Sequence, residues 1–220
     1  MSPSASSRDL ILGRIRAALG EPGPPDEPPV REYLRSHAPD DPAALLDLLH
    51  HNLADYRARV HRCTTVDLPA RIAGLLADRG ARTVALPPDL PADWLTGLEL
   101  DRLIDDGTLT AARLDAVDSV VTGCALAIAE TGTIVLDTGP GQGRRLLTLV
   151  PDHHVCVVRA PEQVVASVPL ALPRLDPALP QTWISGPSAT SDIELDRVEG
   201  VHGPRALDVL LVTAGPVTPA

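Results

Sequence analysis

The sequence contains no lysine and no phenylalanine, so all 19 basic residues are arginines and the aromatic residues are two tryptophans and two tyrosines. Without lysine, the chain can form no Schiff base with pyridoxal phosphate, and it has no P-loop lysine for a nucleotide phosphate. Without phenylalanine, the core has to be aliphatic, and the aromatic platforms that bind single-stranded nucleic acid are not expected.

The net charge and the cysteine content further narrow the functions that this chain could have. The formal net charge of −10 disfavours binding to nucleic acid or to an anionic membrane. Cys63, Cys124 and Cys156 lie far apart in the sequence, so they form no zinc-ribbon spacing and are too few for an iron–sulfur cluster of this chain's own. A sparse, odd number of cysteines fits a reducing cytoplasm. No apolar signal core precedes Arg8, and the longest uncharged stretch, residues 177–191, contains three prolines, so we expect no membrane span.

The first 40 residues have the pattern of an appendage. An amphipathic helix is predicted over residues 7–20, capped by Ser7 and ended by Gly20, and residues 21–29 contain five prolines. We therefore expect an N-terminal helical arm over residues 1–40 and one domain over residues 41–220.

In the body, helical and strand patterns alternate. Asp41-Pro42 is a helix start, and apolar residues from Leu45 to Val60 recur at helical spacing. The predicted helices are 41–60, 67–79, 111–117, 161–168 and one starting near 191. The predicted strands are 63–66, 83–86, 119–122, 133–136, 155–158, 183–184 and 207–212. Several of these strands are continuous apolar runs, which is typical of strands buried on both faces, so we expect an α/β fold with a largely parallel sheet.

Ligands of such sheets bind in loops beyond the carboxyl ends of strands, which directs attention to the loops after Val121, Leu136 and Ile184. The first candidate is Glu130-Thr-Gly-Thr133, which precedes a buried strand. Glu130 could be a general base, a nucleophile or a hydroxyl anchor, with Thr131, Gly132 and Thr133 beside it as ligand-binding groups. The plain alternative is a turn in which Glu130 caps nearby amides.

The second candidate is the glycine-rich loop Thr138-Gly-Pro-Gly-Gln-Gly-Arg-Arg145. Gly141 and Gly143 could present amides to an anion, and Arg144 and Arg145 could supply charge. The loop matches neither a Rossmann fingerprint nor a P-loop, and a surface loop without a ligand explains it equally well.

The third and fourth candidates are Ile184-Ser-Gly-Pro-Ser-Ala-Thr-Ser-Asp-Ile-Glu194 and Glu199-Gly-Val-His-Gly-Pro-Arg205. Ser185, Gly186, Ser188 and Thr190 precede a predicted helix start, where anionic groups are favoured, although plain capping would also place hydroxyls there. Asp192, Glu194 and His202, which Gly203 follows, are candidates for proton handling. His153 and His154 are adjacent in a predicted strand and point to opposite faces, so we predict no metal site.

These segments, in this order and spacing, resemble the lactate utilisation protein C family and its LUD domain, over about residues 42–215. The resemblance implies a three-layer fold similar to the group of ribose-5-phosphate isomerase, glucosamine-phosphate deaminase and CoA transferases. It also implies a role in oxidising L-lactate to pyruvate with iron–sulfur partner proteins. Ala189 stands where the family more often has arginine, which weakens any anion site there unless Arg144, Arg145 or Arg205 compensates.

The leading hypothesis is a cluster-free cytoplasmic subunit of an L-lactate oxidation system. Its motif loops would line one cleft for a small anionic ligand, and the chain would bind no cofactor itself. A second hypothesis is a non-catalytic assembly subunit that recruits iron–sulfur partners through its N-terminal arm. A third, from fold analogy, is an independent transferase or isomerase acting on a phosphorylated or CoA-linked substrate, with Glu130 as its nucleophile.

Overall fold

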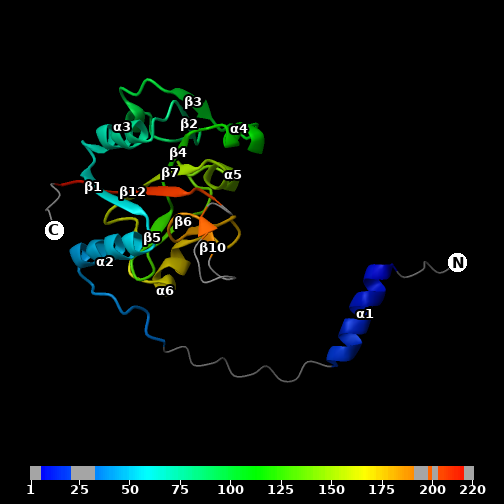
Figure 1. Cartoon of the computed structure of the whole chain (residues 1–220). Coiled ribbons are helices and arrows are strands. Elements are labelled where there is room, and N and C mark those ends of the chain that lie inside the picture. The colour runs from blue at the N-terminus through cyan, green and yellow to red at the C-terminus, as the bar shows by residue number, and fades with distance from the viewer. Residues whose placement is uncertain (1–5, 21–32, 191–197, 200–202, 216–220) are drawn as a thin grey trace. The chain divides into compact units, whose positions relative to one another are not determined.

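The computed structural model describes residues 6–20, 33–190, 198–199 and 203–215. Contacts divide the chain into two units, residues 1–34 and 35–220 (Figure 1). In the first unit, helix α1 spans Ser7–Leu19. Its N-cap is Ser6 rather than the expected Ser7, because the Ser6 hydroxyl accepts from the Asp9 amide while the Asp9 carboxylate accepts from the Ser6 amide.

The second unit is a mixed α/β structure. Its helical segments are α2 (Pro42–Asp55), α3 (Leu68–Asp78), the 3-10 turn η1 (Ala92–Leu95), α4 (Ala111–Asp115), α5 (Arg145–Leu149), α6 (Val168–Ala171) and the 3-10 turn η2 (Leu172–Arg174). Its strands are β1 (Arg59–Thr64), β2 (Thr83–Leu86), β3 (Asp101–Ile104), β4 (Ser119–Thr122), β5 (Leu126–Ile128), β6 (Thr133–Leu136), β7 (His153–Arg159), β8 (Val164–Val165), β9 (Thr182–Ile184), β10 (Ala189–Thr190), β11 (Val198–Glu199) and β12 (Ala206–Thr213).

The main sheet has six strands in the order β1-β12-β7-β4-β2-β3, and every neighbouring pair in it is parallel. A second sheet has the order β8-β5-β6-β9, in which β6 is antiparallel to both neighbours. Strands β10 and β11 form a separate antiparallel pair. The expected largely parallel sheet is therefore confirmed.

The main sheet is covered on both faces, which produces three layers. One face packs against α3, whose Leu68, Ile72 and Leu76 share a core with Val155 and Leu210. On the other face, α2 and the second sheet share a core with the alternate residues of β7 and β12, namely Cys156, Val158, Leu207, Val209 and Leu211. This double coverage explains why β7 and β12 are almost continuously apolar.

Three expectations about single elements were wrong, each because a longer-range contact prevailed over the local pattern. The predicted helix over 161–168 is a turn followed by β8, which pairs with β5: the carbonyls of Gln163 and Val165 accept from the amides of Ala127 in β5 and Ala129 just after it. The helix expected to reach Val60 ends at Asp55, because Arg57 adopts a φ of 68° and the next residues join β1. Strand β1 therefore lies at Arg59–Thr64 rather than at 63–66. Strands β3 and β5 were missed. None of the described helices is long and apolar enough to cross a membrane.

Candidate functional site

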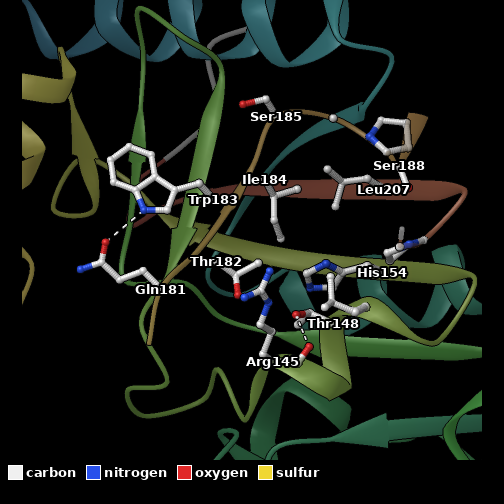
Figure 2. Close-up of a pocket in the computed structure, with 15 residues that line it drawn as sticks. Arg145, Thr148, His154, Gln181, Thr182, Trp183, Ile184, Ser185, Ser188 and Leu207 are labelled. Carbon is white, nitrogen blue, oxygen red and sulfur yellow. Dashed lines mark hydrogen bonds between the residues drawn. The ribbon is translucent and has the colours of Figure 1, made fainter. Parts of the chain in front are cut away.

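Two of the sequence motifs meet in space. The amide of Ser188 donates to the carbonyl of Pro204 at 2.8 Å, and a Cβ on Gly203 would lie 3.5 Å from the Cβ of Ser188. Between these segments and the main sheet lies a pocket of about 340 Å³ (Figure 2), within the usual size range of small-molecule sites. Its lining residues are Arg145, Thr148, Leu149, His154, Gln181, Thr182, Trp183, Ile184, Ser185, Gly186, Pro187, Ser188, Gly203, Pro204 and Leu207.

Four elements position this lining. Strand β9 and the loop after it provide one wall with the hydroxyls of Thr182 and Ser185, and α5 provides Arg145. The floor comes from the amino ends of β7 and β12, where His154 and Leu207 are register neighbours. The loop after Ile184 is thus at the pocket, as the sequence predicts, while the floor lies at the opposite end of the main sheet from the carboxyl ends of its strands.

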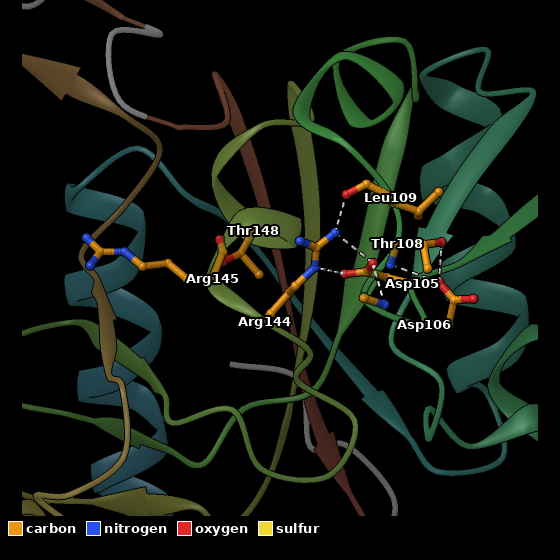
Figure 3. Close-up of polar contacts among 8 residues, drawn as sticks. Asp105, Asp106, Thr108, Leu109, Arg144, Arg145 and Thr148 are labelled. Carbon is orange, nitrogen blue, oxygen red and sulfur yellow. Dashed lines mark hydrogen bonds and ion pairs between the residues drawn. The ribbon is translucent and has the colours of Figure 1, made fainter.

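The two adjacent arginines of the glycine-rich loop have different surroundings (Figure 3). The Arg144 guanidinium donates to both carboxylate oxygens of Asp105, at 2.7 and 2.9 Å, and also to the carbonyl of Leu109. Arg145 points the other way, toward the pocket, and its exposed side chain has no hydrogen-bond or ion-pair partner for its guanidinium among the described residues. Arg145 therefore supplies an uncompensated positive charge at the pocket.

This arrangement identifies which arginine can offset the missing cation at Ala189. Arg144 pairs with the buried Asp105, and Arg205 pairs with Asp152 at 3.4 Å on the surface. Arg145 is the permanently charged residue among those that line the pocket. The sequence pointed to this arginine pair, but nothing local distinguishes the member that faces a ligand from the member that holds the fold.

His154 is a pocket residue that sequence reasoning missed as a ligand group. Its side chain is almost fully buried, and its Nε2 lies 2.7 Å from the hydroxyl of Thr122. The expected alternation is observed, because His153 points to the opposite face and contacts Ser119 and Asp208 instead. Strand alternation could have assigned His154 to one face of the sheet, but its neighbour Leu207 follows from the register of β7 and β12, which the sequence does not reveal.

Glu130 does not line the pocket. Its carboxylate accepts hydrogen bonds from the Ser36 hydroxyl and the Ala38 amide, both at 2.9 Å, and from the His37 amide. Burial raises the pKa of Glu130, but the hydrogen bonds from His37, Ser36 and Ala38 outweigh it and lower the pKa overall. In this structure Glu130 thus fastens the start of the second unit to the loop after β5, and its catalytic role remains a prediction.

The threonines and glycines near Glu130 connect to the pocket differently. The hydroxyl of Thr131 donates to that of Thr133, which lies 2.8 Å from the hydroxyl of the pocket residue Ser185. Gly132 and Gly186 instead make room for α2: a Cβ there would lie 2.7 Å from the backbone of Asn52 and 2.3 Å from the carbonyl of Tyr56, respectively. Both adopt positive φ angles, 55° and 84°. Their lack of a side chain therefore serves helix packing.

The glycine-rich loop is held by the protein itself. The carbonyl of Gly141 accepts from the Gly123 amide at 2.7 Å, and the side chain of Gln142 hydrogen-bonds to Asp137. A Cβ on Gly143 would lie 2.7 Å from Leu147. Neither Gly141, Gly143 nor Arg144 is among the residues that line the pocket, and their ligand contacts stay a prediction.

Three predicted site residues, Asp192, Glu194 and His202, lie outside the described residues. Thr190 lies in β10, which pairs with β11. Within the described part of the chain, no group of three His, Cys, Asp or Glu side chains could hold a metal ion.

Comparison with known proteins identifies the family. The LUD domain model matches residues 46–212. The chain belongs to the LUD domain family. It is 43% identical to lactate utilization protein C of Deinococcus radiodurans over 96% of this chain and 98% of that protein. It is 31% identical to lactate utilization protein C of an Exiguobacterium strain over 96% of this chain and 99% of that protein.

The fold agrees with a solved structure of this family. A crystal structure of a DUF162 family protein from Deinococcus radiodurans matches with a TM-score of 0.66 and 39% sequence identity, covering 79% of this chain and 99% of that chain. The family resemblance and the mixed α/β fold predicted from the sequence are therefore confirmed.

Proposed function

We propose that this LUD domain protein works in lactate utilisation, as a cytoplasmic subunit of a system that oxidises L-lactate to pyruvate. Full-length relatives named lactate utilization protein C support the pathway. The observation that supports a ligand-binding role is the Arg145 guanidinium, which lines the pocket and has no hydrogen-bond or ion-pair partner in the part of the chain that the structure describes.

The pocket offers groups that suit a hydroxy acid. Arg145 would hold the carboxylate, because a guanidinium binds carboxylates with charge-assisted hydrogen bonds. The hydroxyls of Thr182, Ser185 and Ser188 line the same cavity, and the His154 imidazole can exchange a proton with a ligand hydroxyl. His202 precedes the pocket residue Gly203 in the sequence and stays a second candidate for this proton.

The electrons would leave through partners. Oxidation of lactate to pyruvate releases two electrons and two protons, and the three cysteines of this chain are buried free thiols. We therefore assign the electron-carrying clusters to iron–sulfur partner proteins. A three-carbon acid fills only part of the pocket, which leaves room for a group from such a partner.

Binding to the purified full-length chain tests this assignment. Calorimetric titration with L-lactate and pyruvate should give saturable binding that weakens about tenfold or more in Arg145→Gln, the size of one lost charge-assisted contact. Arg205→Gln is the matched control, since Arg205 is exposed and outside the pocket. Equal affinities in wild type and Arg145→Gln would remove Arg145 from the site.

The pathway assignment needs a cellular test. Lactate-dependent dye reduction should disappear in extracts of a strain of the source organism that lacks this chain. Wild type and Arg205→Gln should restore it, and Arg145→Gln should not. Restoration by all three would favour the assembly role over ligand binding, and unchanged activity in the deletion strain would count against lactate oxidation.

A further inference from the structure

A second cavity, of about 360 Å³, lies at the carboxyl ends of three neighbouring strands of the main sheet. Thr65 follows β1, Arg159 ends β7, and Thr213 ends β12, and all three line it. No residue is shared with the pocket around Arg145. The two cavities therefore lie at opposite ends of β7 and β12.

The topology makes this position a crevice. After β1 the chain crosses through α3, which packs on one face of the main sheet, and after β7 it continues into β8 and the second sheet on the other face. Strand β12 lies between β1 and β7. The connections that leave β1 and β7, on either side of β12, thus go to opposite faces of the sheet. Open α/β sheets bind ligands in crevices outside the carboxyl ends of strands, where connections diverge in this way.

The lining combines an apolar interior with a few polar groups. Leu68, Ala160 and Val212 are buried walls, and Trp94 adds a half-buried aromatic ring. At the rim, the guanidinium of Arg159 has no hydrogen-bond or ion-pair partner in the described part of the chain. A mostly apolar cavity with a few convergent polar groups is typical of small-molecule sites.

The rim also carries an acid. Glu162 lies three residues after Arg159, is exposed, and contributes only its backbone carbonyl to a described hydrogen bond, from Arg174. The ligand must therefore tolerate a carboxylate beside a guanidinium, which disfavours a bare anion and favours a molecule that bears both an anionic group and hydroxyl donors.

We propose that this carboxyl-end cavity binds a mononucleotide. The base would stack on Trp94, as nucleobases do on aromatic side chains. The phosphate would pair with Arg159 and the ribose hydroxyls with Glu162, the roles that arginine and acidic residues take in nucleotide sites. The volume is near the lower end of the range for ligand sites, which suits one nucleotide rather than a dinucleotide. This proposal does not depend on the lactate assignment.

The two tryptophans make the test selective, because Trp94 lines the carboxyl-end cavity and Trp183 lines the pocket around Arg145. In full-length Trp183→Phe, Trp94 is the sole tryptophan, and titration with AMP should change its fluorescence saturably. Arg159→Gln in that background should weaken AMP binding about tenfold, because a charge-assisted contact to phosphate is lost. Adenosine, which lacks the phosphate, should bind more weakly than AMP and be insensitive to Arg159→Gln.

Two control measurements distinguish AMP binding in the carboxyl-end cavity from a loss of folding and from binding in the pocket around Arg145. Arg159 is exposed, so Arg159→Gln should unfold at the same temperature as its parent. Arg145→Gln should leave AMP binding unchanged. No saturable signal from Trp94 at millimolar AMP, or equal AMP affinity with and without Arg159, would overturn the proposal. So would inorganic phosphate competing as strongly as AMP, since that would indicate a simple anion site.

Discussion

The amino ends of β7 and β12 present two contrasting regions on their opposite faces. On one face, His153 and Asp208 belong to a closed polar network, and on the other, their sequence neighbours His154 and Leu207 form the floor of the open pocket. Strand alternation sends adjacent residues to opposite faces. The polar groups of the network have protein partners, whereas Arg145 in the pocket has none among the described residues. Groups whose partners are within the protein hold the fold, and a charged group left without one is available to a ligand.

The closed network has a fully buried carboxylate at its centre. Asp208 lies 2.7 Å from His153 Nε2 and 2.8 Å from His61 Nε2, and it pairs with Arg59. The other ring nitrogen of His153 lies 2.8 Å from the Ser119 hydroxyl. Burial raises the pKa of Asp208, but hydrogen bonds from His153, His61 and Arg59 outweigh it and hold the pKa well below its usual range.

The largest loss of stability should come from a substitution that breaks this network. Asp208→Asn removes the buried negative charge and replaces one of the two acceptor oxygens by an amide donor. Arg59 and the two histidines then no longer share a charged acceptor, so we expect the free energy of unfolding to fall by about 3–5 kcal/mol. Asp47→Asn is the matched control: Asp47 pairs with Arg62 but is mostly exposed, and its loss should cost less than about 1 kcal/mol. Urea denaturation of the three proteins measures both. A small loss in Asp208→Asn would show that the network is not structural.

The next largest loss of stability should distinguish Arg144 from the adjacent Arg145. Arg144→Gln deprives the buried Asp105 of its partner, so the free energy of unfolding should fall by about 1.5–3 kcal/mol. Arg145→Gln breaks no described side-chain contact and should change the free energy of unfolding by no more than about 0.5 kcal/mol, although it weakens ligand binding. Equal losses of stability would erase the distinction between the closed and open regions.

A smaller change in the free energy of unfolding is expected when the pH is lowered. Burial lowers the pKa of His153, despite hydrogen bonding to Asp208. Below its unfolded pKa of about 6.5, the unfolded chain binds a proton that the folded chain resists, so stability falls as pH drops from about 7 to 5. His153→Gln should flatten this part of the profile, and exposed His51→Gln should not. Asp208 adds a further fall below about pH 4, since a carboxyl with a lowered folded pKa loses its stabilisation on protonation.

The sequence was informative where the signal was local. Strands 83–86, 119–122 and 133–136 have the predicted bounds, because apolar runs between turns specify them. The helix predicted over 161–168 failed because pairing with β5, far away in the chain, determines that backbone. The roles of Arg144 and Glu130 depend on partners 39 and 92–94 residues away, which no local pattern reveals. The sequence analysis expected the motif loops to line one cleft, but no local pattern indicates the hydrogen bond between Ser188 and Pro204.

The smallest effect on stability should come from a glycine in the open region. Gly203 has no positive φ, and a Cβ there would make ordinary contacts with Ser188 at 3.5 Å and Leu149 at 3.9 Å, both pocket residues. Gly203→Ala should therefore change the free energy of unfolding by no more than about 0.5 kcal/mol while weakening lactate binding measurably.

Gly74→Ala is the control for Gly203→Ala, since a Cβ in the middle of α3 would meet no atom within 4 Å. It should stabilise the fold by about 0.5–1 kcal/mol, because alanine favours helix more than glycine does, and leave lactate binding unchanged. Thermal unfolding and calorimetric titration of both variants give the two quantities. If Gly203→Ala instead lost stability and kept its affinity, the region around Gly203 would belong to the closed part of the molecule, and the pocket would have to be redrawn without it.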